Sequence, residues 1–226
     1  MRKLTTNTFV TLDGVMQAPG GPEEDPTGGF TRGGWSMSYW DDGMGRVIDE
    51  AMSRPLELLL GRKTYEIFAA YWPHVTDDPT ADALNQSRKY VASRTLERAD
   101  WRNSTLIRDV PREVAELKAE DGPEIQVHGS ADLIQTLLEH ELIDAFRVWT
   151  FPLVLGGGKR LFGDGTVPGS FRLTDHTVST TGVVIATYEL AGAVEPGTLE
   201  DSDVLRRHAV EEPSAAELER REKLGA

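Results

Sequence analysis

The feature that most constrains the fold is an alternation of strand-like and helix-like segments from residue 3 to residue 190. Apolar residues alternate over 3–10, as in a strand, and recur at helical spacing over 44–52. The last two strand-like segments, 171–174 and 183–190, have no helix between them. Helices between strands indicate parallel pairing, whereas directly connected strands form an antiparallel hairpin. We therefore predict an α/β protein whose mixed, mostly parallel central sheet is flanked by helices and ends in an antiparallel hairpin.

The alternation stops near its last strand, so we predict one domain over residues 1–190 and an accessory tail over 191–226. The tail holds nine acidic and five basic residues and too few apolar ones for a core. Residues 214–217 match a capping box, and we expect the tail to be partly helical and partly disordered. Residues 18–34 are rich in glycine and proline and are expected to form a long loop.

Charge and cysteine content exclude several classes of protein. The formal net charge of −13 argues against nucleic acid and anionic membranes as partners, because both are bound by basic surfaces. The absence of cysteine excludes disulfides, thiolate metal sites and zinc-dependent nucleobase deaminases. The five histidines lack ligand spacing, so no metal site is predicted. No apolar run could cross a membrane and the N-terminus opens no signal peptide, so we expect a cytoplasmic protein.

Three predicted strands end in turns that suit phosphate binding. These turns contain Gly61, Arg62 and Thr64, then Ser93 and Arg94, and finally Gly129, Ser130 and Ala131, with Ser130 as the expected N-cap of a helix. A helix N-terminus offers unpaired N–H groups, and a guanidinium binds phosphate through two of its own. Each turn alone could be an ordinary connection. Because the carboxyl ends of parallel strands meet at one edge of a sheet, the three together predict a nucleotide cofactor.

Two common nucleotide-binding motifs are absent. No G-x-G-x-x-G follows the first strand, which argues against the usual dinucleotide-binding fold. The glycines at 156–158 precede Lys159 but lack the spacing of a Walker A loop. The sequence therefore argues against kinases and ATPases.

The three turns, in this order, resemble the dihydrofolate reductase-like fold. The likeness is closer to the reductase (C-terminal) domain of the bifunctional riboflavin-biosynthesis deaminase-reductase, whose pattern also matches residues 11–14, 142–144, 152–159 and 161–162. The resemblance covers residues 1–190 and implies an NADPH-dependent reductase that forms a homodimer. By analogy, Arg62, Thr64, Ser93 and Arg94 would hold the 2′-phosphate side of NADPH, and Gly129, Ser130 and Ala131 its pyrophosphate. Gly61 is a further candidate for cofactor binding.

Two carboxylates are candidates for supplying the proton that a hydride acceptor needs, with an ordered water as the alternative. Asp13 follows the first strand, where cofactor and substrate meet in this fold, and could equally be a turn residue. Folate reductases carry an acidic residue on the first helix, and the matching place here is near Gly45. Asp41, Asp42 and Asp49 are the carboxylates nearest to it. Asp42 is the candidate among them, and helix capping is the alternative role of Asp41 and Asp42.

Aromatic residues gather in the long segment 18–40 at a density suited to a pocket for a flat heterocycle. Phe30, Trp35 and Trp40 are therefore candidate substrate contacts, with a packing lid or a dimer contact as alternatives. Thr150 is a further candidate, by fold analogy only.

These observations predict NADPH-dependent hydride transfer to a C=N or C=O bond of a small heterocyclic substrate. The best-specified version is a 5-amino-6-(5-phosphoribosylamino)uracil reductase. Because a zinc-dependent deaminase is excluded, we expect a stand-alone reductase. The alternatives are a non-catalytic NADP-binding sensor or interaction protein, and a folate reductase.

Overall fold

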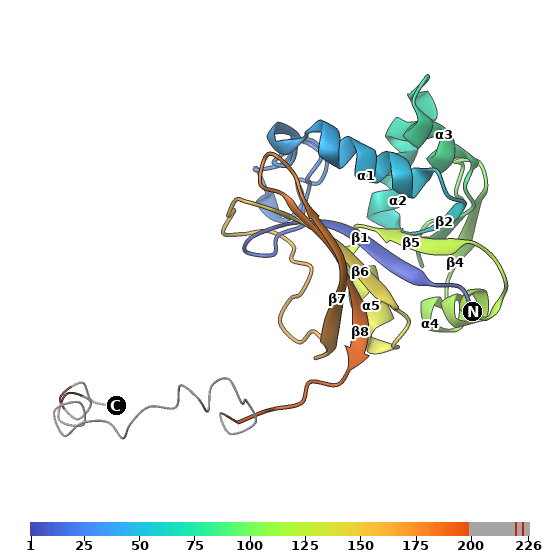
Figure 1. The fold of residues 1–226 in the computed structure, drawn as a ribbon. Helices are drawn as coiled ribbons and strands as arrows, with labels where there is room; N and C mark the ends of the chain where they lie inside the picture. Colours follow the sequence, from blue (N-terminus) through green and yellow to red (C-terminus); the bar gives the residue numbers. More distant parts are fainter. Residues whose placement is uncertain (199–219, 221–222, 224–226) are drawn as a thin grey trace. The chain divides into compact units, whose positions relative to one another are not determined.

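An eight-stranded sheet runs through the part of the chain described by the computed structural model, which comprises residues 1–198, 220 and 223 (Figure 1). The strand order is β4-β3-β2-β5-β1-β6-β8-β7. The strands are β1 (Leu4–Thr11), β2 (Leu56–Gly61), β3 (Lys89–Ala92), β4 (Ser104–Ile107), β5 (Glu124–His128), β6 (Ala145–Phe151), β7 (Ser170–Val178) and β8 (Val184–Gly192). The first six strands in this order, β4 through β6, are parallel to one another. Strand β8 pairs antiparallel with β6, and β7 pairs antiparallel with β8. The predicted fold class is confirmed.

Helices cover both faces of the parallel strands (Figure 1). One face carries α1 (Asp42–Met52), α2 (Arg62–Tyr71) and α3 (Pro79–Gln86), and the other carries α4 (Val110–Ala119) and α5 (Ala131–Glu139). Short 3-10 turns lie at Thr27–Gly29, Met37–Tyr39 and Trp72–His74. Helix α3 was not predicted from the sequence. Its start has a recognisable signal, an aspartate N-cap followed by proline in the first turn.

Strand β2 shows why the sheet forms a two-sided core. Leu58, Leu59 and Leu60 are all fully buried. Leu58 and Leu60 pack in the hydrophobic cluster with α2 and α3, whereas Leu59 belongs to the cluster with α4 and α5. A parallel strand with helices on both faces buries side chains on both sides, so Leu58–Leu60 form an uninterrupted apolar run, and the one charged residue of β2, Glu57, is paired with Arg2.

The chain divides by its internal contacts into Met1–Gly192 and Ala193–Ala226. The strands and helices named above all belong to the first unit. The capping box expected at 214–217 lies outside the described residues. In the described part of the chain, no helix combines the length and apolarity that crossing a membrane requires. The described side chains likewise contain no group of three acidic or histidine residues placed to hold a metal ion.

Candidate active-site cleft

A cleft of about 1600 Å³ follows the carboxyl edge of the parallel strands. Each parallel strand contributes lining residues at its carboxyl end. In the order of the sheet these are Arg108 after β4, Ser93 and Arg94 after β3, Gly61 at the end of β2, Gly129 after β5, residues 16–25 after β1 and Lys159 after β6. Helices α1 and α2 add lining residues from one face of the sheet. Pockets for one small ligand usually enclose about 300–1,000 Å³. This cleft therefore has room for a dinucleotide together with a second molecule.

The turns after β2 and β5 are joined by a single hydroxyl. Gly129 and Ser130 both adopt left-handed backbone conformations, with φ of +56° and +69°. The Ser130 hydroxyl therefore points towards the turn between β2 and α2. There it accepts a hydrogen bond from the Gly61 N–H at 2.9 Å and lies 2.8 Å from the Thr64 hydroxyl. A Cβ at Gly61 would lie 3.0 Å from the Ser130 hydroxyl oxygen and 3.1 Å from its Cβ, so a larger residue at position 61 would push this side chain away.

Ser130 therefore does not cap α5 with its side chain, which corrects the expectation from sequence. Helix α2, which begins after Gly61, also has no side-chain cap. By contrast, α1, α3 and α4 begin with Asp41, Asp78 and Asp109, and each of these carboxylates accepts a hydrogen bond from an N–H of the first turn. The first-turn N–H groups of α2 and α5 thus remain available at the cleft, where an anion can satisfy them.

Arg108 braces the turn after β3. Its guanidinium donates hydrogen bonds to the backbone oxygens of Ser93 and Leu96, the second at 2.5 Å. The Ser93 hydroxyl accepts hydrogen bonds from the N–H groups of Thr95, at 3.3 Å, and Leu96, at 2.9 Å. The turn is therefore fixed at both ends. It presents Arg94, whose exposed side chain has no hydrogen bond or ion pair within residues 1–198.

Arg62 lies opposite this turn, at the start of α2, and is exposed. Its only ion pair in the described part of the chain is a 3.5 Å contact with Glu66, one helical turn away. Exposed pairs at this spacing contribute only about 0.3–0.5 kcal/mol, so Arg62 can exchange Glu66 for a ligand at little cost. Arg62, Lys63, Arg94 and Arg108 together form what we call the basic end of the cleft.

The loop after β1 is held against the glycine-rich loop after β6. The Lys159 ammonium lies 2.6 Å from the carboxylate of Asp25, which is buried. The Gln17 amide oxygen accepts a hydrogen bond from the Lys159 N–H, and the amide nitrogen of Gln17 donates to the backbone oxygens of Asp25 and Thr27. Burial acts to raise the pKa of Asp25, but the hydrogen bonds from Lys159 and Thr27 outweigh it and lower that pKa.

Of the four predicted substrate contacts, Trp40 lies on the cleft. Its ring packs edge-on against Phe9, with the ring centres 5.8 Å apart. Trp35 is buried instead, because its indole N–H donates to the Gln17 backbone oxygen and its ring packs on Phe151. Phe30 packs beside Gly158 and is not among the lining residues. Thr150 is likewise off the cleft, within β6.

Asp13 is a structural residue of the loop contact between β1 and β6. Its carboxylate accepts hydrogen bonds from the Thr11 hydroxyl at 2.5 Å, from the Leu155 N–H at 3.2 Å and from the Gly156 N–H at 2.8 Å. The Thr11 hydrogen bond is the main cause that lowers the pKa of Asp13 to about 2. Asp13 is not among the residues lining the cleft and is ionised at neutral pH, so this geometry does not suit a proton donor.

Asp42 occupies the first turn of α1 and does not line the cleft. Its neighbour Asp41 is the N-cap, and its carboxylate also accepts two 2.6 Å hydrogen bonds from Thr180. The carboxylate of α1 that does line the cleft is Asp49. It belongs to a stripe of Gly45, Ile48, Asp49 and Met52. The spacing of this stripe is that of one helix face, a signal that was present in the sequence and not used.

His128 closes β5 beside the Gly129 turn and lines the cleft. Burial, aided by the positive charge of Arg147, lowers the pKa of His128 to about 4. Its Nε2 lies 3.1 Å from the Gln126 amide oxygen. The imidazole is therefore neutral at physiological pH and adds no positive charge to the cleft.

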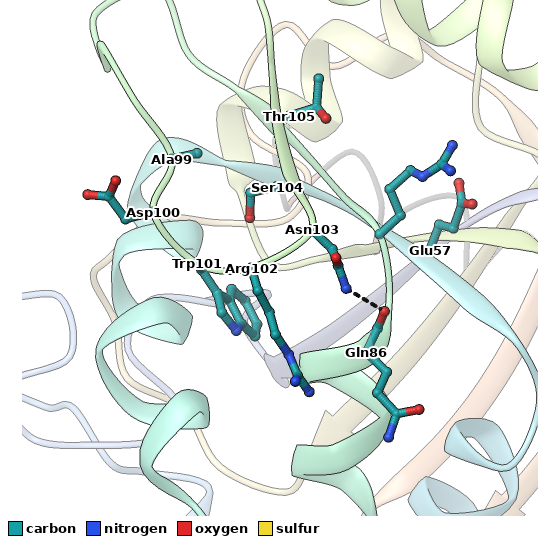
Figure 2. A pocket seen from close by; sticks show the side chains of 10 residues that line it. Glu57, Gln86, Ala99, Asp100, Trp101, Arg102, Asn103, Ser104 and Thr105 are labelled. Atoms are coloured by element: carbon teal, nitrogen blue, oxygen red, sulfur yellow. Dashed lines mark hydrogen bonds between the residues drawn. The ribbon is translucent and has the colours of Figure 1, made fainter.

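A second, smaller cavity lies at the opposite, amino-terminal edge of the strands (Figure 2). Glu57, Asn103 and Ser104 belong to its lining, and the Asn103 amide donates to the Gln86 backbone oxygen at 2.9 Å. Glu57 is already bound by the buried Arg2 guanidinium and by the Tyr90 hydroxyl. Because the charge of Glu57 is neutralised by Arg2 and the larger cleft collects the three strand-end turns, we place the functional site in the larger cleft.

The sheet order and the cleft along its carboxyl edge define an α/β protein of the dihydrofolate reductase-like fold. The profile of the RibD C-terminal domain matches residues 2–185, and the chain belongs to this family. It is 29% identical over 199 residues to YyaP, an uncharacterised protein of Bacillus subtilis (strain 168), covering 84% of this chain and 96% of that protein.

Two solved structures illustrate the fold. One is the Thermotoga maritima diaminohydroxyphosphoribosylaminopyrimidine deaminase/5-amino-6-(5-phosphoribosylamino)uracil reductase, with a TM-score of 0.55, 14% identity and coverage of 84% of this chain and 57% of that one. The other is dihydrofolate reductase from Enterococcus faecalis complexed with NADP(H), with a TM-score of 0.53, 13% identity and coverage of 84% and 96%. At these identities the likeness concerns the fold.

Proposed function

We propose that this chain is an NADPH-dependent reductase that transfers a hydride to a C=N or C=O bond of a small heterocyclic substrate. The observation that carries the proposal is the pair of uncapped helix N-termini, α2 and α5, joined across the cleft by the Ser130 hydroxyl. Their unpaired N–H groups suit the pyrophosphate of a dinucleotide, with Ala131 in the first turn of α5 and Gly129 allowing close approach.

We assign the 2′-phosphate of NADPH to Arg62 and Arg94, which line the cleft at the ends of the neighbouring strands β2 and β3. Arg62 gives up only a weak exposed contact, and Arg94 has no partner among the described residues. Two guanidinium groups suit a phosphate monoester because each offers parallel N–H donors. Ser93 and Thr64 then act mainly on the protein side, shaping the turns that hold these groups.

NADPH would supply the hydride, and the protein would orient the nicotinamide and the substrate and exclude water from them. Trp40 and Phe9 form an aromatic surface on the remaining part of the cleft, where a flat ring can stack. Asp49 is the carboxylate that α1 presents to the cleft, and we propose that it orients the substrate through a polar hydrogen. Asp13 and Asp42 act outside the cleft, in the loop contact and at the start of α1.

A homodimer is part of the proposal. Strand β7 is an edge strand with a mostly exposed surface, and Leu173, Val178, Val184 and Leu190 of the β7–β8 hairpin are 48%, 60%, 39% and 45% exposed. Pairing of two such faces would bury apolar side chains that otherwise contact water. Sedimentation of the full chain tests this, with Leu173→Glu expected to yield monomers.

Two measurements test the reductase proposal. First, titration with NADPH should transfer tryptophan excitation to the nicotinamide, and NADP⁺ should compete. Secondly, NADPH oxidation is followed by absorbance with a panel of heterocyclic imines and carbonyls, including dihydrofolate and 5-amino-6-(5-phosphoribosylamino)uracil. We expect turnover with a member of this panel. NADPH binding without any turnover would identify a sensor, and lack of binding would overturn the proposal as a whole.

A further inference from the structure

The positive charges that line the cleft are concentrated at one end. Arg62, Lys63, Arg94 and Arg108 follow β2, β3 and β4, which are consecutive in the sheet. In the proposed function, on which this inference rests, Arg62 and Arg94 of this set bind the 2′-phosphate of the cofactor. Lys159, after β6, is the one other basic residue among those lining the cleft within residues 1–198.

Lys159 is not available to bind a substrate phosphate. Its ammonium is bound to the Asp25 carboxylate at 2.6 Å, and Asp25 is only 8% exposed. Asp25 is further fixed by the Thr27 hydroxyl at 2.5 Å, and the Lys159 N–H is held by Gln17. Releasing Lys159 would leave a buried carboxylate without its counter-charge, which is strongly unfavourable.

Carboxylates are the main charged groups at the end of the cleft that contains Lys159. Glu23, Glu24 and the paired Asp25 line it after β1, and Asp49 lines it from α1. The other carboxylates of the lining, Asp78, Asp109 and Asp132, lie at the starts of α3, α4 and α5. Glu24 is occupied by the N–H groups of Gly20 and Gly21, and its partial burial raises its pKa. The exposed side chains of Glu23 and Asp49 have no hydrogen bond or ion pair in the described part of the chain. We call Glu23, Glu24 and Asp49 the acidic end.

We infer that the substrate of this cleft carries no phosphate or other negative charge, and is a flat nitrogen heterocycle that is neutral or protonated. A phosphate at the acidic end would be repelled by the carboxylates that line it, and within residues 1–198 no basic side chain lining this end is free of a partner. An amino-substituted ring instead offers N–H donors to Asp49 and a face to Trp40. The ring chemistry is thus that of the pyrimidine and pterin reductases, without the sugar phosphate.

Quenching of Trp40 fluorescence tests the charge of the acidic end without any substrate. The Trp40 emission is obtained as the difference between the wild type and Trp40→Phe, with and without NADPH. We expect caesium to quench it about twofold more strongly than iodide, relative to free tryptophan, because fixed carboxylates attract the cation. Asp49→Asn with Glu23→Gln should reduce this preference. Glu50→Gln, which removes an exposed carboxylate of α1 outside the cleft lining, should not. Equal or stronger quenching by iodide overturns the inference.

Turnover of a matched pair of compounds tests the substrate class directly. We compare 5-amino-6-(5-phosphoribosylamino)uracil with its phosphate-free form, prepared with phosphatase, at saturating NADPH. We expect kcat/KM to be at least about tenfold higher without the phosphate, a preference worth about 1.4 kcal/mol. Asp49→Asn should narrow the difference by aiding the phosphorylated compound. A preference for the phosphorylated compound overturns this inference and leaves the reductase proposal intact. Failure to bind NADPH overturns the reductase proposal. In that case the quenching of Trp40 in the free protein still reports the charge of the cleft.

Discussion

The hydroxyl of Ser130 lies 2.8 Å from the hydroxyl of Thr64, and this contact links the N-termini of α5 and α2. The same Ser130 oxygen accepts the Gly61 N–H, so one side chain holds together two segments that are distant in sequence, the β2–α2 junction and the β5–α5 turn. Had Ser130 capped its own helix, one of the α5 N–H groups would be satisfied internally. Its left-handed backbone turns the hydroxyl away and leaves those groups for a ligand.

Ser130→Ala should therefore weaken NADPH binding and also destabilise the protein. Alanine keeps the Cβ, so the strain of the left-handed backbone changes little. The hydrogen bonds to Gly61 and Thr64, of about 0.5–1.5 kcal/mol each, are lost together with a longer one to the His128 backbone oxygen. We expect NADPH affinity to fall about tenfold, because the two turns are no longer held in register. Calorimetric titration and thermal unfolding measure the two effects.

Ser53→Ala is the matched control. Its hydroxyl donates to the Glu50 backbone oxygen at the exposed end of α1, away from the cleft. This variant should bind NADPH as the wild type does. Equal NADPH affinity of wild type and Ser130→Ala would show that the link between the helices is dispensable for the cofactor.

Arg62→Ala and Arg94→Ala should each reduce the discrimination between NADPH and NADH. A charge-assisted hydrogen bond contributes about 1.5–3 kcal/mol, so each substitution should weaken NADPH about ten- to a hundredfold. NADH lacks the 2′-phosphate and should bind almost unchanged. The two losses need not add, since both guanidinium groups share one phosphate. Dissociation constants for both cofactors, measured by fluorescence titration, check this.

Arg98→Ala provides the control for charge alone. Its side chain is 82% exposed, lies in the same loop as Arg94 and pairs with Asp100 outside the cleft lining. We expect Arg98→Ala to leave the affinities for NADPH and NADH almost unchanged, because the effect of one remote charge is screened by salt. Parallel weakening of NADPH and NADH in Arg94→Ala would place that arginine outside the phosphate site.

Asp13→Asn should lower stability, with a dependence on pH that identifies the carboxylate. The folded-state pKa of Asp13 is lowered from 3.8 to about 2, so its stabilising effect is complete above pH 4 and is lost as the pH falls towards 2. The difference in melting temperature between wild type and Asp13→Asn should thus be largest at neutral pH and shrink below pH 4.

NADPH affinity should be unchanged in Asp13→Asn, because Asp13 does not line the cleft. Asp100→Asn, which removes an exposed carboxylate, should show a smaller difference in melting temperature at neutral pH. If Asp13→Asn abolished turnover while its melting temperature equalled that of the wild type, Asp13 would instead be a participant in proton transfer.

The fold was predictable because its signals are local. The apolar run at 56–60 and the glycines that follow β2 and β5 identify strands, their carboxyl ends and the edge where a ligand binds. What could not be predicted is the direction of individual side chains. Serine before a helix usually caps it, and only the left-handed backbone of Ser130 turns its hydroxyl towards Gly61.

The same limit applies to the carboxylates and aromatic rings. Asp13 and Asp49 are both acidic residues next to strand or helix ends, and the sequence favoured Asp13 by its place in the chain. The hydrogen bonds from Leu155 and Gly156 come from a loop more than a hundred residues away, so no local pattern reveals them. Trp35 is likewise buried through a bond to the Gln17 backbone, which depends on how the long loop folds.

Burial lowers the pKa of His128 in the folded protein from its ordinary value of 6.5 to about 4. Between these two pH values the unfolded chain binds more protons than the folded one, so the free energy of unfolding falls as the pH drops from 6.5 to 4. One group contributes at most about 1.4 kcal/mol per pH unit to this slope. His128→Gln should remove that part of the slope, whereas His140→Gln, at the exposed end of α5, should retain it. Urea unfolding at pH 7 and pH 5 measures the effect. A proton resonance of the His128 ring that titrates near pH 6.5 in the folded protein would contradict it, because the ring would then be charged beside the proposed pyrophosphate turn, and NADPH would bind more tightly as the pH fell through that value.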